Sequence, residues 1–431
     1  MTASTPSLWA NHRYVAWLPS DTSKELAQAL FGFAIPLLAL MVTDGPAQAG
    51  VIGAIGMTTR VALTLYGGVL ADRHRRILLM VTGGVVGVVL AAAFTLLAVG
   101  DALTFASLLV VDVLLAARSG LFDVAGEAAL KEIVAPETMG RAQAANQARS
   151  AALQLAGGPL GGALLVAGGW LVAAVMTVAH ALAAATAALI PRLRGPRIPE
   201  DPAPTPADPR RNALREMREG VAWLFSRPDL RGVLLVTTLV NLGINSAVTT
   251  VIYALQQEGR SPAVIGWIGA AVGAGMLLGA LVAGVLVSRV PTGILTVAGL
   301  GMLALGSAAV TLTTAPWAIA LLLIVPALLV PAVNAGLGGY FMVATPSALL
   351  GRANSATSVF AMGAMPLAPL IAGFGLAWIG RTGTILIAAG ICAAAALLAV
   401  GTRGLRALPS EPGWSTHATL YADRIAAEPR P

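Results

Sequence analysis

Ionisable side chains inside long apolar stretches are the residues of this sequence best suited to chemistry, because charge is costly in an apolar environment. In the first half of the chain, six interrupt such stretches: Arg60, Asp112, Arg118, Asp123, Arg149 and His180. The second half offers mainly neutral polar side chains: Asn241, Asn245, Asn334 and Tyr340. This distribution predicts ion coupling in the first half and neutral polar and apolar substrate contacts in the second.

Asp112 is the best candidate for a proton carrier. It lies near the middle of its stretch, and burial disfavours the charged form of a carboxyl group that has no cation beside it. Asp123 follows eleven residues later, or three helical turns, so the two acids share one helix face while Arg118 points elsewhere. Arg118 is a candidate charge for resetting Asp112. A static buried Asp–Arg pair that holds helices together explains the same residues.

A second polar group lies at the start of the first apolar stretch, where Asp21, Lys24, Glu25 and Gln28 have the spacing of one helix face. A solvated helix entrance is the leading interpretation of the first three, and Glu25 is a further proton-coupling candidate. We expect a substrate path to use the deeper polar residues Gln28, Arg60, Arg149, Asn241, Asn245 and Asn334. His180 is interpreted as a packing residue.

Long apolar helices must position these residues. Of the 431 residues 57% are hydrophobic and 11% are charged, against about 25% charged in a soluble protein. A run of about 20 apolar residues can cross a bilayer. Twelve such runs occur, at residues 26–43, 49–70, 77–99, 103–125, 143–167, 170–190, 232–255, 263–287, 292–314, 317–343, 355–379 and 383–402. We predict an all-α membrane protein with twelve transmembrane helices.

The composition also excludes several classes of protein. Cys392 is the only cysteine, which excludes a disulfide framework and a cysteine-based metal site. No nucleophile–base pair, metal-ligand set or Gly-x-x-x-x-Gly-Lys-Ser/Thr loop for ATP stands out. The net charge of +7 comes from arginines in loops beside the apolar runs. It therefore indicates membrane topology and not a nucleic-acid partner.

Basic residues in the connecting loops orient the helices. On the side of Arg73 these loops carry sixteen Lys and Arg residues, whereas the opposite loops carry only Arg260 and Arg381. The positive-inside rule places the side with more basic residues in the cytoplasm. With twelve spans, both termini are predicted to be cytoplasmic as well.

The chain is predicted to contain two similar six-helix bundles. Related loops, Pro136–Ala144 and Pro346–Ser355, precede the fifth and eleventh runs. We divide the chain into a first bundle, a cytoplasmic linker, a second bundle and a cytoplasmic tail, at residues 1–192, 193–229, 230–403 and 404–431. The linker contains a candidate amphipathic helix at Arg210–Phe225, and the polar tail is expected to be mobile. Many secondary transporters have such duplicated bundles, with the substrate path between them.

The loop between the second and third runs reads Gly68-Val-Leu-Ala-Asp72-Arg73-His74-Arg75-Arg76. It resembles the signature loop of the major facilitator superfamily, one residue short after His74. The resemblance implies the superfamily fold. It also implies that Asp72, with Arg73 and Arg76, pairs with helix ends and loop charges across the bundle and acts as a gate, with Gly68 part of the motif. The alternative is that the arginines only fix topology and bind lipid headgroups.

A glycine-rich segment in the fifth run contains two overlapping Gly-x-x-x-Gly pairs, which let helices touch backbone to backbone. Its residues are Gly157, Gly158, Pro159, Gly161 and Gly162. The segment resembles the antiporter motif of exporters. With the loop Pro136–Asn146 and the segment Glu219–Phe225, it resembles the siderophore- and drug-exporter branch of the superfamily. Plain helix packing explains the glycines equally well.

The resemblance covers nearly the whole chain and implies a secondary transporter that works by alternating access. We expect a proton-coupled exporter of a small amphipathic molecule, such as a drug, siderophore or other natural product. Metabolite uptake or facilitated flux, and lipid flipping of the lysophospholipid type, are the alternatives. The expected protein is a monomer in the cell membrane, in contact with membrane lipids. It has no enzymatic activity, no metal and no cofactor, and the proton gradient drives it.

Overall fold

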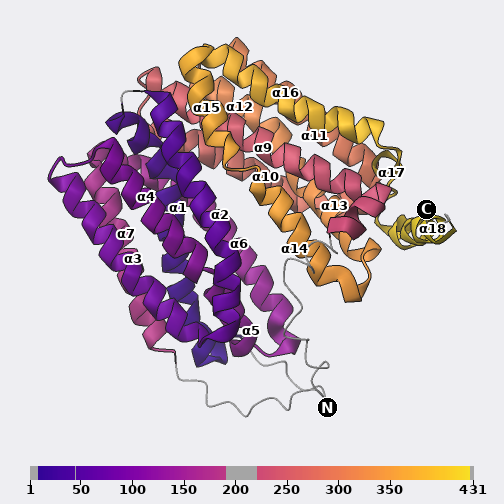
Figure 1. The fold of residues 1–431 in the computed structure, drawn as a ribbon, viewed down its shortest axis with the longest axis horizontal. Helices are drawn as coiled ribbons and strands as arrows, with labels where there is room; N and C mark the ends of the chain where they lie inside the picture. The colour runs from indigo at the N-terminus through magenta and orange to yellow at the C-terminus, as the bar shows by residue number, and fades with distance from the viewer. Residues whose placement is uncertain (1–7, 44, 191–220, 428–431) are drawn as a thin grey trace.

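The computed structural model describes residues 8–43, 45–190 and 221–427, and in these ranges the chain is helical and contains no β-strand. Twelve segments of it are long and apolar enough to cross a membrane. The prediction of an all-α protein with twelve spans is therefore confirmed. The spans form two bundles that lie side by side (Figure 1).

The first bundle holds six spans, the fourth of which is built from two consecutive helices. After a short 3-10 turn, η1 (Leu8–Ala10), its helices are α1 (His12–Val42), α2 (Pro46–Arg73), α3 (Arg76–Val99), α4 (Phe105–Phe122), α5 (Val124–Ile133), α6 (Pro136–Ala167) and α7 (Gly169–Ala188). We call the end of the molecule that carries the loop between α2 and α3 the basic end, and the other the opposite end.

The second bundle also holds six spans, two of which are interrupted near prolines. Its helices are α9 (Pro228–Gln257), α10 (Pro262–Arg289), α11 (Thr292–Ala309) with the 3-10 turn η2 (Val310–Leu312), α12 (Pro316–Ala327), α13 (Val330–Ala344), α14 (Ser347–Gly363), α15 (Leu367–Trp378) and α16 (Gly380–Gly401). The break between α12 and α13 comes just after Pro326. The break between α14 and α15 lies at Pro366, directly before α15 begins. Proline lacks the backbone N–H that a continuous helix requires.

The first, fourth and fifth spans extend beyond the predicted apolar runs toward the basic end. The longest extension is that of α1, which begins at His12 because the Asn11 side chain accepts a hydrogen bond from the Arg13 backbone N–H at 3.0 Å. The extensions pack on one another through a cluster that includes Tyr14, Trp17 and Leu130. Two polar residues on this part of α1, Ser20 and Asp21, are therefore buried in the protein.

The two bundles contact each other closely at the opposite end, where α6 packs against α10 and α2 against α15. These contacts join backbone to backbone. A Cβ atom on Gly158 would lie 2.8 Å from the Gly266 carbonyl oxygen, and one on Gly373 would lie 2.9 Å from Gly50 Cα. Toward the basic end the helices of the two bundles diverge (Figure 1). The interface between the bundles is therefore closed at the opposite end.

The segment after the last span is folded onto the second bundle, which corrects the expectation of a mobile tail as far as residue 427. It forms α17 (Arg403–Arg406), η3 (Glu411–Gly413) and α18 (Trp414–Ala427). The Trp414 side chain is 6% exposed, and its Nε1 donates a hydrogen bond to Thr292 Oγ1 at 3.1 Å. Apolar side chains of the tail thus complete the core of this bundle at the basic end.

Most of the predicted linker, including the larger part of Arg210–Phe225, lies outside the described residues. Residues 221–226 are helical, and Leu224 is fully buried. Arg227 then forms a two-pronged ion pair with Asp229, at 3.0 and 2.8 Å. This pair fixes the start of α9 close to the predicted domain boundary.

Candidate functional site

A cavity of about 270 Å³ lies between the two bundles. Helices α1, α2, α4 and α7 of the first bundle and α9 and α15 of the second contribute to its walls. The walls are mainly apolar, with large side chains such as Phe31, Ile35, Met57, Leu115, Met176, Ile252 and Tyr253. The charged residues Arg60, Asp112 and Arg118 line the same space. Apolar walls with a few polar groups are typical of a small-molecule site.

Asp112 of α4 lines this cavity with only 4% of its surface exposed. Its carboxyl group packs against Gly56 of α2, where a side chain larger than hydrogen would overlap it. Among the described residues none donates a hydrogen bond to Asp112 Oδ2. An acid held in a cavity without a partner is a candidate for proton exchange.

Arg118 pairs with Asp123 and not with Asp112. Its Nη2 lies 3.2 Å from Asp123 Oδ1, and Ser119 Oγ donates a hydrogen bond to Asp123 Oδ2 at 2.5 Å. Asp123 lies at the junction of α4 and α5, within reach of the long arginine side chain although the two residues start from different helix faces. The structure thus contains a buried Asp–Arg pair, formed by Asp123, and it gives Arg118 no contact with Asp112.

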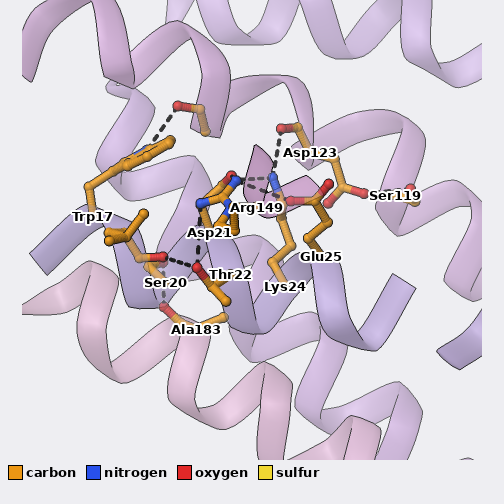
Figure 2. Close-up of polar contacts among 12 residues, drawn as sticks. Trp17, Ser20, Asp21, Thr22, Lys24, Glu25, Ser119, Asp123, Arg149 and Ala183 are labelled. Carbon is orange, nitrogen blue, oxygen red and sulfur yellow. Dashed lines mark hydrogen bonds and ion pairs between the residues drawn. The ribbon is translucent and has the colours of Figure 1, made fainter. Parts of the chain in front are cut away.

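The polar residues of α1 form a buried ion cluster with Arg149 of α6 (Figure 2). Asp21 is 3% exposed, and it accepts a hydrogen bond from Lys24 Nζ at 2.5 Å and another from Arg149 Nη2. The same Nη2 atom lies 3.1 Å from Glu25 Oε2. The interpretation as a solvated helix entrance is therefore wrong for Asp21, whereas the Lys24 and Glu25 side chains stay 18% and 21% exposed. The extended spans enclose this face of α1.

Further contacts tie this ion cluster to α5. Lys24 Nζ donates to the Asp123 carbonyl oxygen at 3.3 Å, and Trp17 Nε1 donates to the Gly126 carbonyl oxygen at 3.0 Å. The Arg149 guanidinium lies 5.3 Å from the centre of the Trp17 ring, within cation–π range. Arg149, predicted to lie on the substrate path, is thus engaged in a structural network. The helix-face spacing on α1 and the arginine in the fifth run were the available signals, but neither indicates that they meet.

A second cavity of about 310 Å³ adjoins the first on the side of the ion cluster. Gln28, Arg60 and Ser119 line both cavities, and Met362 of α14 is the contribution of the second bundle to the second one. With the Gln28 amide in the orientation its neighbours require, its oxygen accepts hydrogen bonds from both Nη atoms of Arg60. Gln28 and Arg60, two predicted substrate-path residues, therefore meet at the junction of the two cavities.

Sequence comparison decides the family of this two-bundle protein. The family model described as Major Facilitator Superfamily matches residues 25–259, which is more than half of the chain. The chain belongs to the Major Facilitator Superfamily. No curated protein sequence matches it significantly. Membership establishes a membrane transporter and not an enzyme, as predicted.

Solved transporter structures share the fold at low sequence identity. A bacterial homologue of the iron transporter ferroportin, in an inward-facing state, has a TM-score of 0.71 and 14% identity over 92% of this chain and 99% of its own. A variant of the nucleoside transporter NupG has a TM-score of 0.64 and 14% identity over 90% of this chain and 100% of its own. A POT family transporter in complex with 5-aminolevulinic acid has a TM-score of 0.66 and 11% identity over 89% and 95%. These likenesses show the superfamily fold and do not identify a substrate.

The signature loop of the superfamily is bound to α5 of its own bundle. Arg76 Nη1 donates to the Ala128 carbonyl oxygen at 2.8 Å and lies 2.9 Å from Glu132 Oε1, while Arg73 is exposed. The Asp72 side chain lies outside the described positions, so its predicted gating contacts stay a prediction.

The two glycines at the start of this loop have different surroundings. A Cβ atom on Gly68 would meet nothing within 4 Å. The close approach to α4 is made instead by Gly67, where a Cβ would lie 3.0 Å from the Leu121 carbonyl oxygen. The glycine with a packing reason is therefore the one just before the Gly68–Arg76 motif.

The antiporter-like glycines of α6 face two different helices. Cβ atoms on Gly157 and Gly161 would lie 3.0 Å from Ala29 Cβ and 2.7 Å from Phe33 Cδ1, both on α1 of the same bundle. Gly158 and Gly162 face α10 of the other bundle. One helix thus uses adjacent glycine pairs for packing within its bundle and for closing the interface between bundles. Pro159 lies within α6 between them.

The other predicted polar residues are distributed unevenly around the first cavity. Asn245 lines it and donates a hydrogen bond to the Asn241 carbonyl oxygen at 2.7 Å. The Asn241 amide in turn points to the Ala361 carbonyl oxygen at 3.5 Å. Asn334 is exposed and lines neither cavity, so the structure does not bring it to the site. His180, interpreted as a packing residue, is 2% exposed and lines the first cavity.

Proposed function

We propose that this superfamily member is a proton-coupled exporter of a small amphipathic molecule and works by alternating access. The observation that carries the proposal is Asp112, a carboxyl group without a hydrogen-bond donor at its Oδ2, in the mainly apolar cavity between the bundles. An acid in this position can bind a proton in one step of the transport cycle and release it in the step in which substrate binds. In this proposal the protein works as a monomer in the cell membrane and needs no bound cofactor.

The shape of the molecule supports a state that is open to the cytoplasm. The positive-inside count assigns the basic end to the cytoplasm, and the bundles are closed at the opposite end. The similar fold of the ferroportin homologue was solved in an inward-facing state, which agrees with this assignment. Substrate then enters from the cytoplasm, and the resemblance of Gly157–Gly162 to the exporter motif favours outward transport.

In this mechanism the contacts between the bundles at the opposite end separate and re-form. Gly158 against Gly266 and Gly50 against Gly373 allow α6–α10 and α2–α15 to pack without side chains between them. Opening to the outside separates these backbone contacts, and return to the inward state restores them. Asp112 lies on a bundle that moves relative to the other, so the solvent that reaches its carboxyl group changes with the state.

Transport by everted membrane vesicles tests the proposal. With an acid interior, vesicles should accumulate an amphipathic fluorescent probe from a panel that includes ethidium and dansylglycine. A protonophore should abolish accumulation, and Asp112→Asn should lose it. Asp101→Asn is the matched control, because Asp101 is exposed and its φ of 50° suits asparagine. Undiminished accumulation by Asp112→Asn removes Asp112 from the mechanism.

The vesicle orientation tests the alternatives. Transport found only in right-side-out vesicles indicates uptake. Movement of a headgroup-labelled lysophospholipid between leaflets, without accumulation of any soluble probe, indicates a lipid flippase. Either result overturns the proposed export.

A further inference from the structure

We propose that the substrate of this protein is an amphipathic organic anion whose acidic group binds the guanidinium of Arg60. This inference deepens the proposed function and rests on it only in taking the cavity between the bundles as the substrate site.

Arg60 presents a guanidinium to both cavities with a neutral partner only. It is an exposed residue of α2 and lines the first and second cavities. The Gln28 amide oxygen accepts hydrogen bonds from its two Nη atoms. Among the described residues no carboxylate lies within ion-pair distance of it, although every other arginine of the cavities is paired with an acid. No ion pair with a described residue therefore neutralises its charge.

The other ionisable groups around the first cavity are less accessible to a ligand. Asp112 is 4% exposed behind Gly56, and Arg118 is 5% exposed and paired with Asp123. His180 is 2% exposed. Arg60 is thus the charged group of this cavity that a bound molecule meets first.

The acids that line the second cavity do not pair with Arg60 in place of an anionic ligand. Asp21 and Glu25 are held by Lys24 and Arg149, and Asp123 by Arg118. Glu127 is exposed and lines the second cavity only. While Asp112 is protonated, Arg60 is therefore the one positive charge of the first cavity that no described carboxylate pairs with.

The remaining walls suit the apolar part of the same molecule. Phe31, Met57, Met176 and Ile252 line the first cavity beside Arg60. A guanidinium binds a carboxylate or similar oxyanion through two parallel hydrogen bonds, and these are strong where water is excluded. A ligand with an acidic group at one end and an aromatic or aliphatic body at the other fits this arrangement. Among the described residues the one acid of this cavity that an organic cation could meet is Asp112, which is 4% exposed behind Gly56.

Two probes that share one fluorophore and differ in charge test the inference. Dansylglycine carries a carboxylate, and dansylcadaverine carries an ammonium group. Fluorescence titration of the purified full-length protein should show saturable binding of dansylglycine and weaker binding of dansylcadaverine. Arg60→Gln should weaken dansylglycine binding by roughly tenfold or more, the loss expected for a charge-assisted contact. Arg60→Lys, which keeps the charge but loses the planar fork, should lie between the two.

The control substitution is Arg289→Gln, which removes one charge from an exposed site that lines neither cavity and should leave the affinity unchanged. A Tm equal to that of the wild type shows that Arg60→Gln is folded. If Arg60→Gln does not fold, the affinity of Arg60→Lys for dansylglycine is the measurement that decides. The inference is overturned if dansylglycine does not saturate, binds no better than dansylcadaverine, or keeps its affinity in the Arg60 variants.

The binding assay is independent of proton coupling. Loss of dansylglycine affinity in Arg60→Gln together with undiminished transport by Asp112→Asn refutes the proposed proton carrier and supports the anion site. Normal dansylglycine affinity in Arg60→Gln together with lost transport by Asp112→Asn refutes the anion site alone.

Discussion

Replacing Asp21 by asparagine tests whether the ion cluster on α1 is a buried structural network. Asp21 is 3% exposed and pairs with both Lys24 and Arg149. Removing one member of a buried ion pair costs roughly 3–5 kcal/mol, because the partner is left without a counter-charge. Here the cost is smaller, since Arg149 keeps Glu25 and the Arg149 and Glu25 side chains are 12% and 21% exposed.

We expect Asp21→Asn to lower the free energy of unfolding by about 2–3 kcal/mol. At roughly 2 °C per kcal/mol for a large chain, this corresponds to a fall in Tm of about 5 °C. Thermal unfolding in detergent at a fixed scan rate is the assay. Asp21→Asn, Arg149→Gln and the double variant form a cycle, in which the double variant should lose clearly less than the sum of the single losses.

The Glu132–Arg76 pair provides the matched control cycle. These side chains are 40% and 24% exposed, so their coupling should be below about 1 kcal/mol. The account of the cluster is refuted if the Asp21–Arg149 cycle shows no more coupling than this control. Such a result would restore the interpretation of a solvated helix entrance.

Two further substitutions test the packing at the two ends of the molecule. Gly158→Leu should reduce transport by more than about tenfold, because a Cβ at this site already lies 2.8 Å from the Gly266 carbonyl oxygen and the bundles cannot close. Gly301→Leu, at a position with nothing within 4 Å of its Cβ, should transport normally, and equal vesicle rates for the two variants would contradict the closure. Trp414→Ala should destabilise the protein by roughly 3–5 kcal/mol and expose the tail to limited proteolysis, because a buried aromatic ring is removed. Trp267→Ala, at a 67% exposed tryptophan, should leave both the Tm and the digestion pattern unchanged, and a tail equally resistant in Trp414→Ala would contradict the packing.

The spans could be predicted from the sequence because membrane crossing depends on local properties. Length and hydropathy of each run mark a helix, and all twelve predicted runs correspond to observed spans. The glycine spacing around Gly158 likewise indicates a helix face for close packing, since the sequence itself shows where glycine leaves that face without side chains. Local patterns do not state which helix meets that face, and the partner of Gly158 lies in the other bundle.

The partners of the buried charges could not be predicted, because they depend on contacts between distant residues. Asp21 and Arg149 are 128 positions apart, and only the packing of α1 against α6 brings them together. The extension of α1 to His12 also escaped prediction, since polar residues interrupt its apolar ones and these gain burial from neighbouring extensions. A buried Asp–Arg pair was one of the interpretations, but its acid, Asp123, was not identified. Helix-face geometry fixes where a side chain starts and not how far an arginine reaches.

The folded tail shows the same limitation. Leu405, Leu408 and Trp414 are scattered in a polar sequence without a helical period, so the sequence favoured a mobile segment. In the structure all three are buried against the second bundle. Their burial depends on a surface that α11 and α13 create at the basic end.

The central claim is that Asp112 exchanges a proton for substrate in the cavity between the bundles. The most direct measurement is proton movement in proteoliposomes that enclose a pH-sensitive dye, driven by a gradient of a probe that the vesicle assay has shown to be transported. The wild-type protein and Asp101→Asn should move protons against the flow of the probe, and Asp112→Asn should move none. Proton movement at the wild-type rate in Asp112→Asn would contradict the claim.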